Sequence, residues 1–323
     1  MIVLAALLAL QADSGAALYQ AWCRSCHGSD GRGTASAAAR LEVPPANLAE
    51  CRSSTAEPDA RWVGIVARGG AAYGLSLDMP AFGEGATPEQ IGAVVRCIRS
   101  LCAEPGWPRG ELNFPRPFLV EKAFPENELV VVQRGREQQW VYERRVGKRL
   151  QLEATAHAVF DSLARPFGGV TGGVKYNLWH SLERRALASL GVEATPPLGR
   201  QDAWEVEPFL AAGAAPGNAL VLQAEIVATW EEAAGLVGWS YRLGAGREVG
   251  RFTPIVEVGW DVPRRGEPTL SVYPQTRIRL SRLGHVAASL GAELPARGPE
   301  PRHPRLIAFV LWDYGDAGLL RGW

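Results

Sequence analysis

The stretch LVLQAEIVATWE, residues 220–231, alternates between apolar and polar side chains. All of its even-numbered positions are apolar, whereas Gln223, Glu225, Thr229 and Glu231 occupy odd-numbered positions. A period of two is that of a β-strand, whose successive side chains point to opposite faces of a sheet. The stretch therefore predicts a long strand that separates an apolar environment from a polar one.

Segments of the same kind fill the chain from residue 129 to residue 314. We predict about twelve strands, near residues 129–135, 138–147, 149–161, 169–182, 184–196, 203–214, 219–231, 234–244, 252–262, 269–282, 285–296 and 304–314. Turn-like breaks such as APGN at 215–218 and PRRG at 263–266 separate them, and no long helical pattern intervenes. Strands joined by short turns pair antiparallel, so we expect an all-β, up-and-down β-barrel over residues 129–323.

Alternation alone does not decide which face of these strands is wet. A soluble sandwich or lipocalin-like barrel turns its apolar face inward, whereas a membrane barrel turns that face toward lipid. The predicted strands, about ten to thirteen residues long, match a tilted bilayer span better than a soluble strand. Aromatic residues such as Trp140, Trp230 and Trp260 lie toward strand ends, as in an interfacial girdle. Length and aromatic placement therefore favour a membrane barrel.

The polar face and the chain end add to this interpretation. Acidic and basic residues mix on the polar face, as suits a lumen with paired charges: Glu153, Lys175, Glu193, Glu225, Glu257, Arg277 and Arg279. The sequence ends in Trp323. In this respect the region resembles bacterial outer-membrane barrels, which typically end in an aromatic residue.

A different signal lies near the N-terminus, in Cys23-Arg24-Ser25-Cys26-His27. This is the C-x-x-C-H spacing of covalent c-type haem attachment. C-x-x-C alone could also be a thioredoxin-like redox pair or half of a zinc site, but no second C-x-x-C exists and the preceding residues are helical and Ala-rich. The motif predicts one haem c, bound through Cys23 and Cys26, with His27 as an axial iron ligand.

The methionine residues provide a candidate for the sixth ligand of the haem iron. The chain contains only Met1 and Met79, and Met79 lies in the Pro- and Gly-bearing segment 78–83. A methionine that fills a core gap is the alternative. Thioether ligation by Met79 would favour reduced iron and occupy the position where oxygen or peroxide binds. It therefore predicts an electron carrier rather than an enzyme, with no catalytic residues.

Residues 13–102 resemble a class I cytochrome c domain. The matching features are the attachment helix, the Gly-rich loop 28–33, the segment 43–48, a middle helix over 62–68, and a last helix that Thr87 and Pro88 open. The apolar positions Ile91, Val94, Val95 and Ile98 have helical spacing. The resemblance implies an all-α fold whose first and last helices cross.

Three further cysteines are Cys51, Cys97 and Cys102. In an oxidising compartment a disulfide is expected. Cys102 falls on the same helical face as Ile91 and Ile98, whereas Cys97 does not, so helical periodicity favours Cys51–Cys102 over Cys51–Cys97. Three reduced thiols are the remaining alternative.

The other segments bound the domains. Residues 1–12 resemble the apolar core of a secretory signal, although they lack Lys and Arg. Residues 103–128 carry five prolines and are predicted to be a stiff, extended linker.

Lys plus Arg equals Asp plus Glu at 34 each, so no basic excess suggests a nucleic-acid partner. His157, His180, His285 and His303 are isolated and suggest no second metal site.

Together these features predict an exported protein of a Gram-negative bacterium. A periplasmic Met/His haem would exchange electrons with redox protein donors and acceptors, anchored by an outer-membrane barrel. One alternative is an outer-membrane channel with the haem domain as redox gate. Another is the haem-bearing subunit of a periplasmic dehydrogenase, with a soluble β-domain.

Overall fold

The computed structural model describes residues 14–38, 40–104, 106–160, 166–217, 219–299 and 303–315. The predicted signal segment 1–12 and the terminal Trp323 lie outside these ranges. The chain divides into two compact units, Met1–Glu111 and Leu112–Trp323. The first unit is helical and the second is a β-barrel, in the predicted order.

The helical unit is built from short elements. They are α2 (Gly15–Trp22), α3 (Arg24–His27), α4 (Ala35–Ala38), α5 (Cys51–Ala56), α6 (Asp59–Arg68), η1 (Gly70–Tyr73), α7 (Pro88–Leu101) and, at its end, η2 (Gly110–Leu112). Helix α6 begins three residues before the predicted start, at Asp59, and Gly69 ends it in a left-handed conformation with φ 76°. Among the described residues, no helix is both long enough and apolar enough to cross a membrane.

The predicted start of the last helix is confirmed in detail. The Thr87 side chain accepts a hydrogen bond from the backbone of Gln90, and the Gln90 side chain accepts one from the backbone of Thr87. This reciprocal capping box, with Pro88 in the first turn, fixes where α7 begins. The predicted apolar face is buried at Ile91, Val94, Val95 and Ile98.

Helices α2 and α7 pack closely against each other. A Cβ atom at Gly15 would overlap the carbonyl of Ala93, so only glycine permits this approach. Leu18, Tyr19 and Cys23 from the N-terminal helices share one apolar core with Val94 and its neighbours on α7. The crossing that the cytochrome resemblance implies is therefore present, and the attachment motif is fixed to the core.

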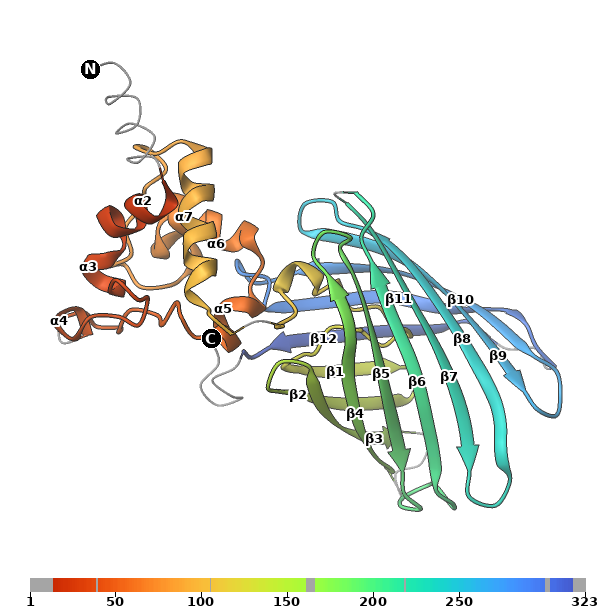
Figure 1. Cartoon of the computed structure of the whole chain (residues 1–323). Coiled ribbons are helices and arrows are strands. Elements are labelled where there is room, and N and C mark those ends of the chain that lie inside the picture. The colour runs from red at the N-terminus through yellow and green to blue at the C-terminus, as the bar shows by residue number, and fades with distance from the viewer. Residues whose placement is uncertain are drawn as a thin grey trace, which may run out of the picture. The chain divides into compact units, whose positions relative to one another are not determined.

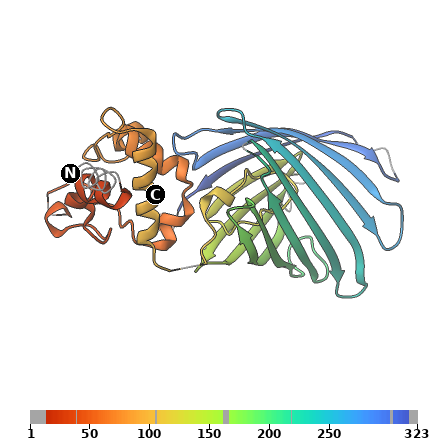
Figure 2. The same ribbon diagram turned by 45° about the horizontal axis from the view of Figure 1, so that its top comes forward.

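The second unit is a closed barrel of twelve strands within the described residues (Figures 1 and 2). They are β1 (Glu128–Arg134), β2 (Glu137–Val146), β3 (Leu150–Val159), β4 (Phe167–Ser181), β5 (Ala186–Thr195), β6 (Glu205–Ala214), β7 (Leu220–Glu231), β8 (Gly235–Arg247), β9 (Phe252–Pro263), β10 (Thr269–Arg279), β11 (Val286–Arg297) and β12 (Arg305–Asp313). Each pairs antiparallel with its chain neighbour, and β1 pairs with β12, where Glu128 faces Asp313. The predicted strands and the up-and-down order are confirmed.

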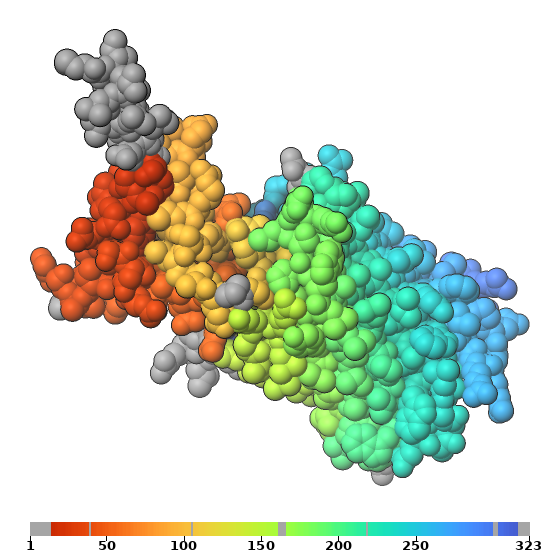
Figure 3. All heavy atoms as spheres, in the orientation of Figure 1, coloured from red at the N-terminus to blue at the C-terminus, as the bar shows by residue number. Residues whose placement is uncertain are grey.

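The outer wall of the barrel is apolar. On β7, Leu222, Ile226 and Trp230 are each more than 40% exposed, and the other strands show the same pattern with Trp140, Leu190, Leu243 and Val310. Side chains of β4 to β8 cover this wall as a continuous layer in Figure 3. A wall of exposed leucine, valine and tryptophan is unfavourable in water but is the surface that lipid requires.

The interior of the barrel is lined largely by polar and charged side chains, beside an apolar cluster that includes Leu187, Phe209 and Val227. Buried wall side chains include Glu143, Arg145, Gln151, Thr155, Lys175, Asn177, Ser189, Gln223, Glu225, Glu257, Gln275, Ser289 and Glu293. A soluble β-barrel has the reverse arrangement, with apolar residues inside. The distribution of side chains therefore decides between the two predicted barrel types, in favour of the membrane barrel.

Residues 112–127 differ from the expected linker. The sequence predicts an extended connector over 103–128, but the barrel unit begins at Leu112, well before β1. Leu112, Phe114, Val120 and Phe124 are buried, at no more than 5% exposure, against barrel residues. The prolines keep this segment out of the sheet because they lack an N–H for the strand ladder, yet the segment packs inside the barrel rather than outside it.

Candidate functional site

The C-x-x-C-H motif lies at the junction of two helices. Cys23 separates α2 from α3, and its backbone N–H donates to the Tyr19 carbonyl at 2.9 Å. The Tyr19 hydroxyl donates to the Gly28 carbonyl at 2.8 Å, which closes the loop behind the motif. The Cys23 side chain is buried in the helical core, whereas Cys26 and His27 are half-buried. This arrangement fixes one thiol and leaves the other two groups accessible to a ligand.

The His27 ring is oriented by the segment that the cytochrome resemblance places beside it. Its Nδ1 lies 3.1 Å from the carbonyl oxygen of Ala46. Burial lowers the pKa of His27, although the contact with Ala46 opposes that shift. A neutral ring that donates from Nδ1 keeps a free lone pair on Nε2. That is the tautomer required of a haem-iron ligand.

Met79 lies on a loop that is anchored at several points. Its carbonyl accepts a hydrogen bond from Gly70 at 3.0 Å, and Phe82 and Gly83 donate to the α6 carbonyls of Val66 and Ala67. The Met79 side chain is half-buried. The loop therefore holds the thioether in a defined place rather than in the apolar core, as a ligand requires.

The thiols do not have the properties of a dithiol redox site. Burial raises the pKa of Cys23 to about 11, and nearby cysteines add to the shift. Redox-active C-x-x-C pairs depend on the opposite change, a lowered thiol pKa that yields thiolate at neutral pH. The thioredoxin-like alternative is therefore not supported by the environment of this pair.

The residues present fit a haem. The indole Nε1 of Trp62 is buried and has no hydrogen-bond acceptor among the described residues, so a bound group with a carboxylate could satisfy it. Trp22 stacks on Phe82, with ring centroids 5.2 Å apart, and both rings are only half-buried. Large rings left partly open on the same core as Cys23 are the surroundings that a porphyrin would cover.

Cys51 and Cys102 form a disulfide, and Cys97 is a free, half-buried thiol. The bridge joins the first residue of α5 to the residue that ends α7. It closes a loop with a sequence separation of 51 residues, which contains Met79 and the whole of α6. The loop that carries the predicted sixth ligand is thus covalently closed.

A charged cluster packs α6 against the end of the helical unit. The Asp59 carboxylate contacts Arg99 at 2.8 Å and Arg109 at 2.5 Å. Arg99 also donates to the carbonyls of Ser54 and Glu57. Burial alone would raise the pKa of Asp59, but hydrogen bonds and charge from the two arginines outweigh it and hold that pKa below its usual range.

Asp59→Asn should therefore destabilise the helical unit in a pH-dependent way. The folded pKa of Asp59 is the lower one, so its contribution is complete above the unfolded pKa and disappears as the pH falls through the folded value. We expect a loss of about 1 kcal/mol at neutral pH, kept small because the Asp59 side chain is 42% exposed. The difference from wild type should begin to shrink below about pH 4, near the unfolded pKa, and disappear as the pH falls through the lower folded value.

Urea unfolding at several pH values, followed by haem absorbance, measures this difference. Asp30→Asn is the matched control, because Asp30 is an exposed carboxylate that lies 3.6 Å from Arg32. It should leave the unfolding free energy almost unchanged. An Asp59→Asn difference that persists undiminished at the acid end would contradict the assignment.

The barrel lumen holds a cavity of about 500 Å³ that the sequence did not predict. Its walls carry carboxylates and arginines from several strands, including Glu193, Glu207 and Arg242, and its floor includes Arg116 and Phe118. His157 lines it as well and contacts the Thr171 hydroxyl through Nε2 at 2.9 Å. His180, on β4, contacts Asn177, with its Nδ1 2.9 Å from the amide oxygen Oδ1. Polar contacts thus account for both rings, as expected for isolated histidines.

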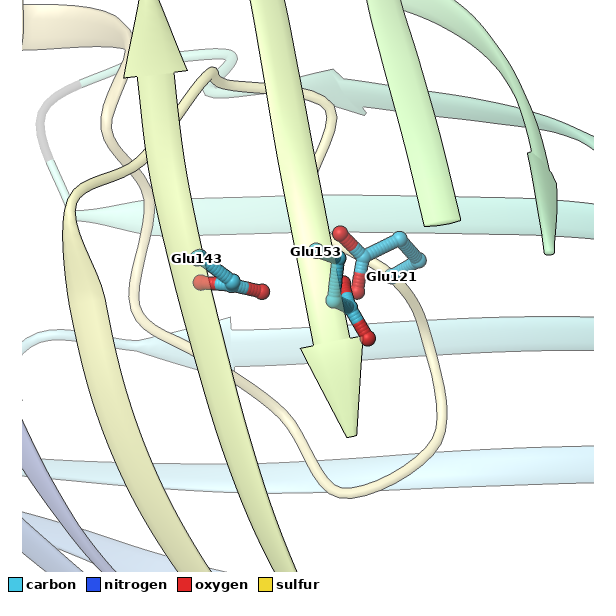
Figure 4. Close-up of side chains that lie close together, drawn as sticks. All are labelled: Glu121, Glu143 and Glu153. Carbon is cyan, nitrogen blue, oxygen red and sulfur yellow. The ribbon is translucent and has the colours of Figure 1, made fainter. Parts of the chain in front are cut away.

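Three carboxylates meet inside the barrel, from Glu121 on the segment before β1 and from Glu143 and Glu153 on β2 and β3 (Figure 4). One oxygen of each lies within 4.8 Å of the others. Arg116 donates to both oxygens of Glu143, and Lys175 donates to Glu121 at 2.5 Å. Both oxygens of Glu143 and one oxygen of Glu121 thus accept from cationic side chains of the barrel unit, so the cluster is an internal ion-pair network.

Comparisons with known proteins give one family match and several structural likenesses. Residues 10–98 match the family model described as cytochrome C oxidase, cbb3-type, subunit III. No curated protein matches the chain. The KdgM porin is similar at 10% identity and TM-score 0.45, covering 57% of this chain and 96% of its own.

Two further solved structures have the same TM-score. The NanC porin is similar at 7% identity and TM-score 0.45, covering 58% of this chain and 98% of its own. The COG4313 outer membrane channel from Pseudomonas putida F1 is similar at 12% identity and TM-score 0.45, covering 62% and 99%. The barrel assignment rests on the strand pairing and wall polarity rather than on these likenesses. The chain thus joins a cytochrome c domain to a twelve-stranded antiparallel barrel.

Proposed function

We propose that this protein carries electrons through one covalently bound haem c in the periplasm and is anchored in the outer membrane by its barrel. The observation that carries the proposal is the C-x-x-C-H motif, with His27 Nδ1 held by Ala46, in the same chain as a barrel whose outer wall is apolar. Haem supplies reversible one-electron chemistry. Cys23 and Cys26 would hold the porphyrin, and His27 and Met79 would ligate the iron.

The residues of this chain set the properties of such a centre. His27 is kept in the tautomer that ligates, and Met79 is kept on a fixed loop. A thioether in the sixth position favours the reduced iron and leaves no open position for oxygen. We therefore propose a carrier between redox proteins rather than an enzyme.

The barrel sets the location in this proposal. Strand β1 begins and β12 ends at the same end of the barrel, since Glu128 pairs with Asp313. Bacterial outer-membrane barrels with an even number of strands have short periplasmic turns, and their two ends lie on that side. The N-terminal end of β1 would then lie on the periplasmic side, where the haem domain and its redox partners would reside.

Fractionation tests the proposal directly. Cells that mature c-type cytochromes should yield the protein in the outer-membrane fraction, with haem that survives denaturing electrophoresis and changes spectrum on reduction. The Cys23→Ala/Cys26→Ala variant is the control, because it should keep the membrane location and lose the covalent haem. Recovery of wild type in the soluble periplasm, or without covalent haem, would refute the proposal.

A further inference from the structure

The segment 112–127 fills the barrel across its width. Its side chains Leu112, Phe114 and Phe124 join one apolar cluster with Leu187, Phe209 and Val227 of the wall. Around the barrel, lumen-facing residues that are no more than 7% exposed occur on most strands: Val130, Glu143, Gln151, Asn177, Ser189, Ala211, Gln223, Glu257, Gln275, Ser289 and Phe309. Because these side chains are shielded from water without a partner chain, the segment itself shields them.

Glycines in the wall provide the room for individual side chains of this segment. A Cβ added at Gly213 would lie 2.8 Å from the Phe114 ring, and one at Gly259 would lie 2.9 Å from Leu119 Cδ1. Real Cβ contacts are not this short, so a larger residue at Gly213 would force the Phe114 ring out of its place. The wall is shaped to this particular sequence.

The backbone of the segment is also hydrogen-bonded to side chains of the barrel wall. The buried Glu257 carboxylate accepts from the N–H groups of Phe118, Leu119 and Val120, at 2.6, 2.7 and 3.1 Å. A carboxylate buried at 0% exposure is costly unless such donors surround it. Further wall contacts come from Gln151, which accepts from the Glu126 N–H, and Gln223, which donates to the Pro115 carbonyl.

Charges of the segment are paired with charges of the wall. Arg116 contacts Glu143 at 2.9 Å and Glu128 at 3.0 Å, and Lys175 contacts Glu121. The Glu121 N–H also donates to Glu225 at 3.1 Å. Removing the segment would leave Glu143, Lys175 and Glu257 buried without these partners, at a cost of several kcal/mol each if they stayed dry.

We propose that residues 112–127 are a resident plug that closes the lumen, so that the barrel does not conduct solutes in its resting state. The cavity of about 500 Å³ ends on this plug, since Arg116, Pro117, Phe118, Leu119 and Glu121 line it. It reaches residues at the β1–β2 hairpin end, such as Arg134 and Glu137, and is therefore a blind vestibule of the barrel. This property is independent of the haem: the plug would seal the barrel whether or not the protein carries electrons.

Planar-bilayer conductance of the full-length, haem-loaded protein tests the plug. Wild type should show no discrete opening steps. A variant in which a Gly/Ser sequence of equal length replaces residues 113–126 should show porin-like steps, because the lumen is then polar and wet. Gly213→Leu should also conduct, since its side chain would occupy the place of the Phe114 ring. Heat-dependent mobility on gels checks that each variant forms a folded barrel.

Gly172→Leu is the matched control for Gly213→Leu. Gly172 is an exposed strand residue with no atom within 4 Å of an added Cβ, so its substitution should leave the barrel silent. The proposal is overturned if wild type conducts with the same steps as the Gly/Ser variant. It is equally overturned if the folded Gly/Ser variant is as silent as wild type.

Discussion

Met79→Ala should abolish the absorption band of the methionine–iron bond and lower the reduction potential by on the order of 100 mV, a fraction of the roughly 0.8 V over which axial ligands tune haem. The thioether stabilises reduced iron more than oxidised iron, so its loss favours the oxidised state. The fold should survive, because the Met79 backbone contact with Gly70 does not involve the side chain. Visible spectroscopy and a potentiometric titration of the purified protein measure both effects.

Leu77→Ala is the matched control for this substitution. Leu77 lies two residues earlier on the same loop and is 85% exposed, so its truncation alters the loop surface without removing a ligand. Its spectrum and potential should match wild type. An unchanged band and potential in Met79→Ala would exclude Met79 as the sixth ligand and leave the core-filling interpretation.

The Cys51→Ser/Cys102→Ser variant should lose about 4 kcal/mol of unfolding free energy in the helical unit. The bridge closes a loop of 51 residues, and the chain-entropy account of disulfides gives roughly this value for a loop of that size. Loss of the bridge raises the entropy of the unfolded chain, and it also frees the segment that contains Met79. Thermal or urea unfolding, followed by haem absorbance, measures the change.

Reduction and a single-cysteine variant provide the comparison. A thiol reductant should lower the stability of wild type to that of the double variant and leave the double variant unchanged. Cys97→Ser removes the remaining free thiol and should cost no more than about 1 kcal/mol, because Cys97 is only half-buried. A reductant effect that disappears in Cys97→Ser instead would show that the bridge uses Cys97.

The strands could be predicted because each one separates lipid from a polar lumen. Leu222 and Glu225 of β7 face opposite environments, so the environment imposes a period of two along the whole strand. The sequence could not decide which face of each strand points into the barrel, since barrels with an apolar interior and barrels with an apolar outer wall share the same alternation. In the structure, Glu143 and Glu257 are buried whereas Trp140 and Trp260 are exposed, which shows that the polar face points inward.

The plug could not be predicted, because its partners are remote in the chain. Glu257, more than a hundred residues away, accepts three of its backbone N–H groups, and no local pattern encodes such contacts. A signal was nevertheless present. Segment 103–128 combines charges such as Arg116 and Lys122 with aromatic residues such as Phe118, and a solvated linker has no need of that combination.

The haem motif could be recognised at once, because a covalent attachment site must be contiguous in sequence. The contacts that support the motif and its domain could not be predicted. The contact of His27 with Ala46 and the contacts of Asp59 with Arg99 and Arg109 join residues that only the fold brings together. The short helices α4 and α5 escaped notice because four to six residues are too few for a clear helical period.

The plug also constrains how the molecule is assembled. Residues 112–127 directly precede β1, and the barrel is complete only when β1 meets β12. A ring that closed first would hold Glu143 without Arg116 and Glu257 without the three N–H donors of the segment, and would leave space at Gly213 and Gly259 unfilled. We therefore expect the segment to enter before the last seam forms and so to act as a template for folding as well as a filling of the finished barrel.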